Sequence, residues 1–483
     1  MIHKKGYNLD GISYSFIHQI ITTETSKESM SESQGNHESN SLDPEMGTQK
    51  KSDLSSLLSA SSFMFFCRVF GAAIAFLTQL LLARWMGAHE LGIYVYAFSW
   101  CIILSAIVGL GYEAATFRVI GQALSNKRFD LIKGYILRGQ QMLLLMGLIT
   151  VLIFSSILNF SDGIFDPEYK DTLMLALITI PVYLIAVFHE SVSHAFSWFA
   201  MMIMPNNLIR PSILLLALTI TWFTTGSLSS EKVMLYQLLA IMAVVFVHFL
   251  IFRKKVKAVV GNTPASFETL SWIRIGLPQL IPVLFIAFLA EINVIMVGFY
   301  LPPEEVAIFS ISFRVAMLIT FMIFAVDSIF RPKAALLFAD GNMQDLQKLT
   351  AHSTQLMFWP GLLCVIIFIL LGKFILGVFG EEFVVGYEVF ALLAVSQLFT
   401  VSIGPVATLL NVTGHQDYSL MVFSTALIVL IILDVILTPI FGMKGAAIAV
   451  IIVTAFWNFW LLALVKKHLK IHPTVLSFAH SYK

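Results

Sequence analysis

Long apolar runs separated by short polar interruptions follow one another along the chain from about residue 55 onward. A helix needs about 18 to 20 mainly apolar residues to cross the roughly 30 Å of hydrocarbon in a bilayer. Twelve runs reach this length, so we predict twelve transmembrane helices. Their approximate ranges are residues 60–84, 91–115, 139–160, 172–193, 206–226, 233–252, 276–299, 306–329, 354–378, 384–410, 418–440 and 445–465.

The composition agrees with this pattern. Hydrophobic residues make up 58% of the chain and charged residues only 12%, and the mean hydropathy is +0.84. These values are typical of an all-α polytopic membrane protein. The net charge is +1 and the basic residues form no patch, which excludes a nucleic-acid partner. Cys67, Cys101 and Cys364 lie inside apolar runs, with neither disulfide nor metal spacing.

The first fifty residues differ from the rest of the chain. The stretch "TTETSKESMSESQGNHESNSLDPEMGTQKKSD" is rich in Ser, Glu, Asn and Gly and holds almost no large apolar side chain. Such a composition predicts disorder. We find no secretory signal and expect this tail to stay in the cytoplasm.

Lys and Arg are distributed unequally between the predicted loops, and this bias predicts the orientation. With the N-terminus inside, the inside set is Lys4, Lys5, Lys27, Lys50, Lys51, Arg118, Lys127, Arg128, Lys133, Arg138, Arg210, Arg253, Lys254, Lys255, Lys257, Arg274, Arg331, Lys333, Lys348, Lys466, Lys467, Lys470 and Lys483. The outside set is only Arg84, Lys170, Lys232, Lys373 and Lys444. We therefore expect both termini in the cytoplasm.

The two halves of the hydrophobic region share a weak internal repeat. At a shift of 215 residues, Glu90 aligns with Glu305 and Phe98 with Phe313. Since each half has an even number of spans, this predicts two six-helix bundles related by a pseudo-twofold axis along the membrane normal. The expected organisation is a disordered tail at 1–54, a bundle at 55–252, a cytoplasmic connecting loop at 253–272, a bundle at 273–466 and a cytoplasmic tail at 467–483.

Four ionisable residues fall inside predicted spans: Arg68, Glu291, Arg314 and Asp434. Such residues face a water-filled cavity or a partner, because lipid does not solvate them. Arg68 and Arg314 come from opposite halves, and guanidinium groups in a central cleft would suit a phosphate or diphosphate. The alternative is structural, with each arginine paired to a buried carboxylate such as Glu291.

Two charged pairs lie at corresponding cytoplasmic ends of spans. Glu113 precedes Arg118 after span 2, and Asp327 precedes Arg331 by one helix turn after span 8. We favour ordinary boundary salt bridges and snorkelling cations as the explanation, and the alternative is a cytoplasmic gate that breaks and reforms.

Polar and proline positions interrupt two other spans. His189, Glu190 and His194 predict a solvated turn at the membrane interface rather than a proton relay. Pro278 and Pro282 make span 7 a candidate bending element, since each proline removes a backbone hydrogen bond. We find no nucleotide-binding Gly loop, no GxSxG motif and no metal-spaced Cys pair, so we expect no enzyme activity, cofactor or bound metal.

The ordered motifs resemble one membrane protein family. They are "RVFGAAIAFLTQLLLARWMGAHELGIYVYAFS", "GLGYEAATFRVIG", "NNLIRPSILLL", "GLPQLIPVLFIAFLAEINVIMVGFYLPPEEVAIFSISFR", "LLNVTGHQDYSL" and "TPIFGMKGAAIAV". Together they are similar to the oligosaccharide-lipid flippases, the polysaccharide-transport branch of the multidrug/oligosaccharidyl-lipid/polysaccharide exporter superfamily. That family commonly has Asp at the position of Glu291, where this chain keeps the negative charge on a longer side chain.

The resemblance implies a flippase in the bacterial cytoplasmic membrane. It would move an undecaprenyl-diphosphate-linked oligosaccharide between leaflets by alternating access, for surface polysaccharides such as O-antigen or exopolysaccharide. Arg68, Arg314 and Glu291 are then the substrate-binding candidates, and Glu291 and Asp434 the ion-coupling candidates. Expected partners are the lipid-linked oligosaccharide, membrane lipids and a polysaccharide polymerase. The alternatives are a drug/cation antiporter of the same superfamily and a membrane-embedded polysaccharide polymerase or ligase.

Overall fold

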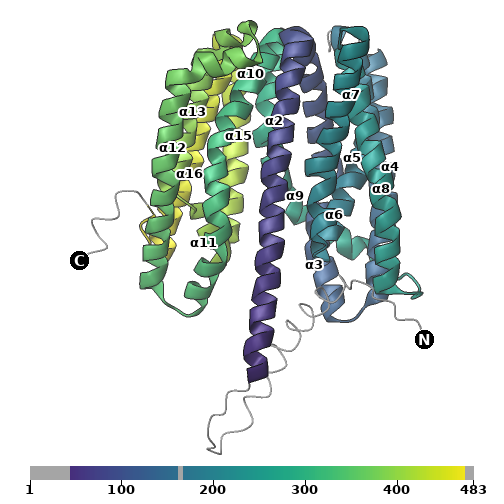
Figure 1. Cartoon of the computed structure of the whole chain (residues 1–483), viewed down its shortest axis with the longest axis vertical. Helices are drawn as coiled ribbons and strands as arrows, with labels where there is room; N and C mark the ends of the chain where they lie inside the picture. The colour runs from purple at the N-terminus through teal and green to yellow at the C-terminus, as the bar shows by residue number, and fades with distance from the viewer. Residues whose placement is uncertain (1–43, 161–166, 474–483) are drawn as a thin grey trace, which may run out of the picture.

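The computed structural model describes residues 44–160 and 167–473. Every regular element in these ranges is helical, and together they form an all-α bundle with two halves (Figure 1). Most of the predicted tail at 1–54 lies outside the described residues, and residues 44–54 belong to the first described helix. The predicted tail at 467–483 is described only as far as residue 473.

The N-terminal half lies on the right in Figure 1. Its elements are α2 (Pro44–Val108), α3 (Tyr112–Ser125), α4 (Phe129–Phe160), the 3₁₀ turn η1 (Pro167–Tyr169), α5 (Lys170–Ala195), α6 (Phe199–Met204), the π-helical segment η2 (Pro205–Ile209), α7 (Arg210–Thr225) and α8 (Ser230–Val260).

The C-terminal half lies on the left in Figure 1, except for α9, which lies near the centre. Its elements are α9 (Thr269–Tyr300), α10 (Pro303–Ala316), η3 (Met317–Thr320), α11 (Phe321–Ala339), α12 (Met343–Phe379), η4 (Glu381–Gly386), α13 (Tyr387–Ile403), α14 (Val406–Val412), α15 (Gln416–Phe441) and α16 (Met443–Leu469).

The described residues contain ten helical segments long and apolar enough to cross a membrane, and a bent pair formed by α10 and α11 makes an eleventh. One of the ten, Val69–Val108, turns back at Gly87, where φ is 75° and ψ is 172°. This left-handed region favours glycine because it lacks a Cβ atom. Counting the two arms of α2 separately gives the twelve predicted spans.

The ends of the bundle follow from the chain direction. The first arm of α2 begins at the lower end of the molecule in Figure 1 and rises, so Gly87 lies at the upper end. The loop between α3 and α4, the last turns of α8 and the end of α16 lie at the lower end. From the element order, most described residues of the predicted inside set lie next to this lower end, Arg210 being an exception within its helix, while Arg84, Lys170, Lys232, Lys373 and Lys444 lie next to the turns at the upper end.

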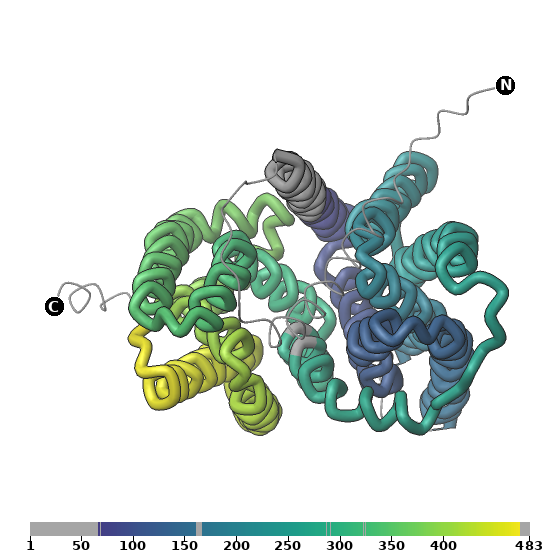
Figure 2. The backbone as a smooth tube through the Cα atoms, turned by 90° about the horizontal axis from the view of Figure 1, so that it is seen from below, coloured from purple at the N-terminus to yellow at the C-terminus, as the bar shows by residue number. Residues whose placement is uncertain are grey.

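Helix α9 connects the two halves. At its lower end Gly276 approaches Gly111 so closely that a Cβ on Gly111 would lie 2.2 Å from the Gly276 carbonyl oxygen, and Trp272 packs edge-on against Tyr135 of α4. Helix α9 also packs extensively along α15 of the C-terminal half. The loop that leads to α9 runs along the lower edge of the N-terminal half (Figure 2), where the Ser266 amide donates to the Asp130 carbonyl, and it covers only residues 261–268. The predicted loop at 253–272 is therefore too long, because α8 continues to Val260.

The predicted repeat agrees with the element order. The second arm of α2 starts after Gly87 and α10 starts at Pro303, close to the shift of 215 residues. Helices α4 and α12 start at Phe129 and Met343, again in corresponding places. His89 contacts Glu304, its own equivalent at that shift, with a distance of 2.8 Å from Nδ1 to Oε1. Equivalent residues can touch only where they lie next to the symmetry axis, so the pseudo-twofold axis passes between the second arm of α2 and α10.

Close packing of α2 on α10 requires glycine at position 92. A Cβ built on Gly92 would lie 1.8 Å from the Pro303 carbonyl oxygen, so Gly92→Ala must push the two helices apart. We expect it to cost at least about 1–3 kcal/mol and to lower the thermal midpoint of the detergent-solubilised protein, followed by tryptophan fluorescence. Gly121→Ala is the matched control, because a Cβ there meets nothing within 4 Å. Equal midpoints for the two variants would contradict this packing.

Candidate functional site

A polar pocket of about 460 Å³ lies within the N-terminal half. Helix α3, the second half of α5 and the η2 segment with the start of α7 form its walls. Charged groups on membrane-spanning helices need water or a partner around them, so the pocket is a place where the bundle admits water. Its lining residues are Glu113, Ala114, Phe117, Tyr183, Val187, Glu190, Ser191, His194, Asn206 and Arg210.

Helix α5 presents one stripe of residues to this pocket. Tyr183, Val187, Glu190 and His194 recur at the spacing of an α-helix and therefore share a face. The opposite face is buried, and His189 belongs to it: its ring is fully buried and its Nε2 lies 2.7 Å from the Gln140 side chain. The turn predicted at His189, Glu190 and His194 is wrong, because α5 continues to Ala195. The helix places Glu190 and His194 on the pocket face and His189 on the buried face.

Arg210 enters the pocket from the middle of a membrane-spanning helix. The apolar segment Phe199–Thr225 carries it near its centre, and η2 immediately precedes it. A π-helical turn inside an α-helix is frequent at functional sites. No carboxylate in the described part of the chain forms an ion pair with Arg210, although Glu113 and Glu190 line the same pocket. Tyr183 interacts electrostatically with all three of these charges.

Arg210 was not among the predicted site residues, because span 5 was predicted to start at residue 206, which places this arginine at the cytoplasmic boundary. The structure starts the span at Phe199, since the run "FAMMIM" before Pro205 is helical and apolar. Proline at the start of the π-helical segment does not end the helix here. Reading residues 199–225 as one helix would have found the arginine.

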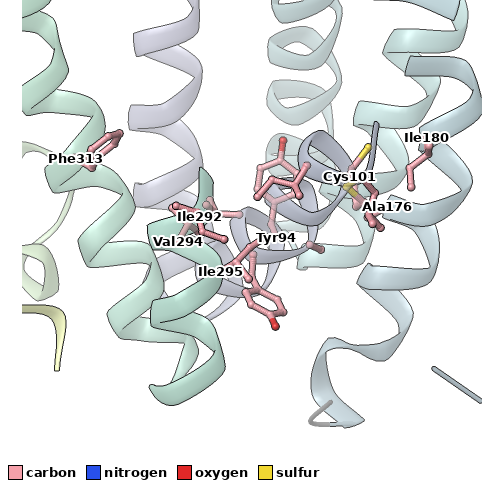
Figure 3. Packing of buried hydrophobic residues seen from close by; sticks show 14 of the residues in the cluster. Tyr94, Cys101, Ala176, Ile180, Ile292, Val294, Ile295 and Phe313 are labelled. Carbon is pink, nitrogen blue, oxygen red and sulfur yellow. The ribbon is translucent and has the colours of Figure 1, made fainter. Parts of the chain in front are cut away.

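Glu291 joins the two halves inside the membrane. Its Oε2 accepts a hydrogen bond of 2.6 Å from Ser99 Oγ on the second arm of α2, and both residues are buried. The neighbouring Ile292 and Ile295 of α9 belong to the same buried apolar cluster as Tyr94 of α2 (Figure 3). An isolated carboxylate here would lose its hydration without compensation, so the serine hydroxyl stabilises it.

The predicted cleft arginines are not paired with Glu291 in the described residues. Arg314 lies at the end of α10 and donates from Nε to Ser310 Oγ over 3.2 Å. Tyr94 of α2 interacts electrostatically with Arg314, with Arg210 and, more weakly, with Glu291. The side chain of Arg68 lies outside the described residues. Its backbone belongs to α2 beside Cys67, which packs against Met202 and Ile203 of α6.

Asp434 is the second predicted ion-coupling residue. It lies on α15 with its side chain fully buried, and neither carboxylate oxygen has a hydrogen-bond partner among the described residues. Thr438, one turn further along the same helix, also has a buried hydroxyl without a described partner. A buried unsatisfied carboxylate needs an explanation such as a bound proton, ion or water.

The two predicted gate pairs differ in the structure. Asp327 and Arg331 form an ion pair of 2.9 Å across one turn of α11. Glu113 instead lines the N-half pocket, and no ion pair between Glu113 and Arg118 occurs in the described residues. Arg118 is exposed and does not line this pocket. The correspondence expected from the sequence is therefore absent, and the gate role itself stays a prediction.

Contacts between the halves close the upper end. Arg84 Nε donates to the Val378 carbonyl over 2.6 Å, and the Ala88 amide donates to Glu382 Oε1 over 2.8 Å. His89 contacts Glu304 from the opposite half and Glu168 from its own half. At the lower end α11, which continues α10, packs instead on α12 and α14 of its own half. The described conformation is therefore joined at the upper end.

The family model described as polysaccharide biosynthesis protein matches residues 57–329. This match confirms the resemblance inferred from the sequence motifs. A search of curated protein sequences gave no match.

Solved structures share the fold at low sequence identity. One is a multidrug resistance MATE family transporter of the MOP superfamily in an inward-facing conformation, with a TM-score of 0.69 and 12% identity over 83% of this chain and 94% of that one. Another is the lipid II flippase MurJ in an inward closed conformation, with a TM-score of 0.67 and 14% identity over 84% and 87% of the two chains. A MOP superfamily transporter from Pyrococcus furiosus gives 0.59 and 14% over 85% and 95%.

The hydrogen bond between Ser99 and Glu291 can be tested by a double-mutant cycle. Since a hydrogen bond to a charged group contributes about 1.5–3 kcal/mol, we expect Ser99→Ala and Glu291→Ala to show a coupling energy of this size in thermal or denaturant unfolding. Ser125→Ala, at an exposed serine of α3, should leave stability within about 0.5 kcal/mol. Additive effects of the two core substitutions would show that the hydroxyl and carboxylate do not interact.

Proposed function

This chain belongs to the polysaccharide biosynthesis protein family, and on that premise we propose that it is a flippase for undecaprenyl-diphosphate-linked oligosaccharides. It would move these precursors across the bacterial cytoplasmic membrane by alternating access and so supply surface polysaccharide synthesis. The process is transport, without covalent chemistry.

The observation that carries this proposal is the polar pocket inside a membrane-spanning half. A glycan and a diphosphate cannot enter hydrocarbon, whereas the lipid chain that carries them can stay in the bilayer. A protein that moves such a lipid must therefore enclose polar groups at membrane depth and leave a path to one side. The pocket with Arg210, Glu113 and Glu190 supplies such an environment.

The contacts between the halves support alternating access. The seal made by Arg84, Ala88 and His89 closes the upper end, while α11 packs away from the N-terminal half at the lower end. The concentration of Lys and Arg at the lower end favours a cytoplasmic location for that end. The described conformation would then receive its substrate from the cytoplasm, and breaking the upper seal would release it on the other side.

Arg314 and Arg68 remain our candidates for contact with the diphosphate, because one guanidinium group can donate two parallel hydrogen bonds to two phosphate oxygens. Glu291 and Asp434 remain candidates for coupling to an ion gradient. Asp327 with Arg331, and Glu113 with Arg118, remain candidates for a cytoplasmic gate. A polysaccharide polymerase that consumes the flipped glycan fits as a partner.

One observation favours a second candidate function. Glu113 and Glu190 are two carboxylates in one pocket, and a drug/cation antiporter would use such groups for a cationic substrate. Arg210 opposes that function, because its unpaired positive charge lies on the same pocket. The membrane-embedded polymerase or ligase that we considered from the sequence has no comparable support.

Flipping of a fluorescent undecaprenyl-diphosphate glycan in proteoliposomes tests the function. We expect the wild-type protein to flip this lipid. Arg68→Ala and Arg314→Ala should each lower the flipping rate about 10- to 100-fold, because each removes a charged hydrogen bond to the diphosphate. Arg253→Ala, on an exposed arginine at the end of α8, should keep the wild-type rate. Folding is checked by thermal unfolding. A wild-type protein that exports cationic dyes and does not move the lipid would establish the antiporter instead.

Ion coupling through Asp434 predicts a selective defect. We expect Asp434→Asn to abolish the acceleration of flipping by an imposed sodium or proton gradient, because the amide carries no charge and cannot exchange a proton at neutral pH. The rate without a gradient should stay within about twofold of wild type. Asp340→Asn, at an exposed aspartate after α11, is the control and should keep its gradient response. A full gradient response in Asp434→Asn would exclude this residue.

A further inference from the structure

We propose that the N-half pocket binds the sugar portion of the lipid-linked substrate and not its diphosphate. This inference rests on the proposed function and divides the substrate between the two halves. The glycan would lie against α3, α5 and α7, and the diphosphate would lie closer to Arg314 of α10.

The charge balance of the pocket argues against the diphosphate. Its lining contains two carboxylates, Glu113 and Glu190, and a single guanidinium, Arg210. The two carboxylates also interact with each other electrostatically, which shows that they lie near one another. A diphosphate brought to this wall would meet more negative than positive charge. An uncharged polyol would meet acceptors and donors without that repulsion.

Two charged groups on this wall are available to a ligand. Glu113 and Arg210 line the same pocket but do not pair with each other, and no described group forms a hydrogen bond with either side chain. Adjacent hydroxyls of a sugar ring can donate to a carboxylate, while the fork of a guanidinium donates to ring and hydroxyl oxygens. A saccharide would thus satisfy both charges at once.

A third polar group is already oriented. Asn206 donates from Nδ2 to Oε2 of Glu190, which holds the carboxylate against η2. The backbone of the neighbouring Asn207 lies so close to Gly71 that a Cβ on that glycine would be 2.4 Å from the Asn207 carbonyl oxygen. Packing against α2 therefore fixes the segment that positions Glu190, and preorganisation of this kind lowers the cost of binding.

Aromatic rings complete the pocket. Phe117 lines the same pocket as the charged residues and is 60% exposed. Its ring centroid lies 5.4 Å from that of His194. Tyr183 lines the pocket from α5. The negative face of an aromatic ring attracts the weakly positive C–H groups on the apolar face of a sugar. The volume of about 460 Å³ suits a short saccharide rather than a whole lipid-linked oligosaccharide.

Binding of two sets of fluorescent lipids to the purified full chain in nanodiscs tests the inference. One set is undecaprenyl diphosphate carrying glucose, galactose or N-acetylglucosamine, and the other is undecaprenyl diphosphate without a sugar. We expect at least one sugar-bearing lipid to bind more tightly than the bare lipid. Glu113→Gln and Glu190→Gln should each weaken that binding about tenfold and change the affinity for the bare lipid less than twofold.

Arg314→Ala is the complementary variant and should weaken both sets of lipids. Glu268→Gln, at the exposed glutamate before α9, should change neither. The inference is overturned if no sugar-bearing lipid binds more tightly than the bare lipid, or if the two pocket variants weaken both sets equally. Thermal unfolding identifies any variant that fails to fold, and Tyr183→Phe then provides a milder change in the same wall with the same expected selectivity.

The outcome separates this inference from the proposed function. If sugar-selective binding is found but the same lipids are not flipped in proteoliposomes, the flippase assignment fails and the sugar site stands. If the lipids are flipped and the pocket variants slow bare and sugar-bearing lipids alike, the flippase stands and the sugar site fails.

Discussion

Hydrocarbon does not solvate charge, and this constraint determines where every polar group of the bundle lies. Glu291 lies within the membrane because Ser99 of the opposite half donates a hydrogen bond to it. Arg210 lies there because its helix borders a water-accessible pocket. The remaining positive charges are concentrated in loops and helix ends. Glu291 thus marks a contact between the halves and Arg210 a cavity, whereas Gln140 and His189 pair inside one half and Asp434 has no hydrogen-bond partner among the described residues.

The boundary between the halves does not coincide with the loop at 261–268. Helix α9 belongs to the second half in sequence, yet its lower part packs on α3 and on Tyr135 of α4. Pro278 and Pro282 lie inside α9, just after the Gly276 that approaches Gly111. A movement that opens the upper end must therefore bend α9 or slide it along one neighbour, because it cannot follow both halves as a rigid rod.

Much of the fold could be predicted from the sequence, because twelve apolar runs and the bias of Lys and Arg report on the bilayer directly. The position of Arg210 inside a span could not be predicted, because the predicted span started just after Pro205. In the structure this proline begins a π-helical turn and the helix continues through it. His189, Glu190 and His194 were predicted as one turn because three polar residues in an apolar run suggest a break. In the structure one continuous helix places His189 on a different face from Glu190 and His194. Contacts distant in sequence, such as Ser99 with Glu291, left no local signal.

The contact between His89 and Glu304 bears on how this architecture arose. These two residues occupy equivalent places in the halves and meet beside the pseudo-twofold axis. In an ancestral homodimer with identical halves, a residue at that place would face its own copy. Two carboxylates there would repel each other, and two histidines would have no carboxylate to pair with. Gene fusion removes this restriction. Once the two copies lie on one polypeptide, each can mutate alone, and a complementary pair at the axis becomes accessible to a single chain and to no symmetric dimer.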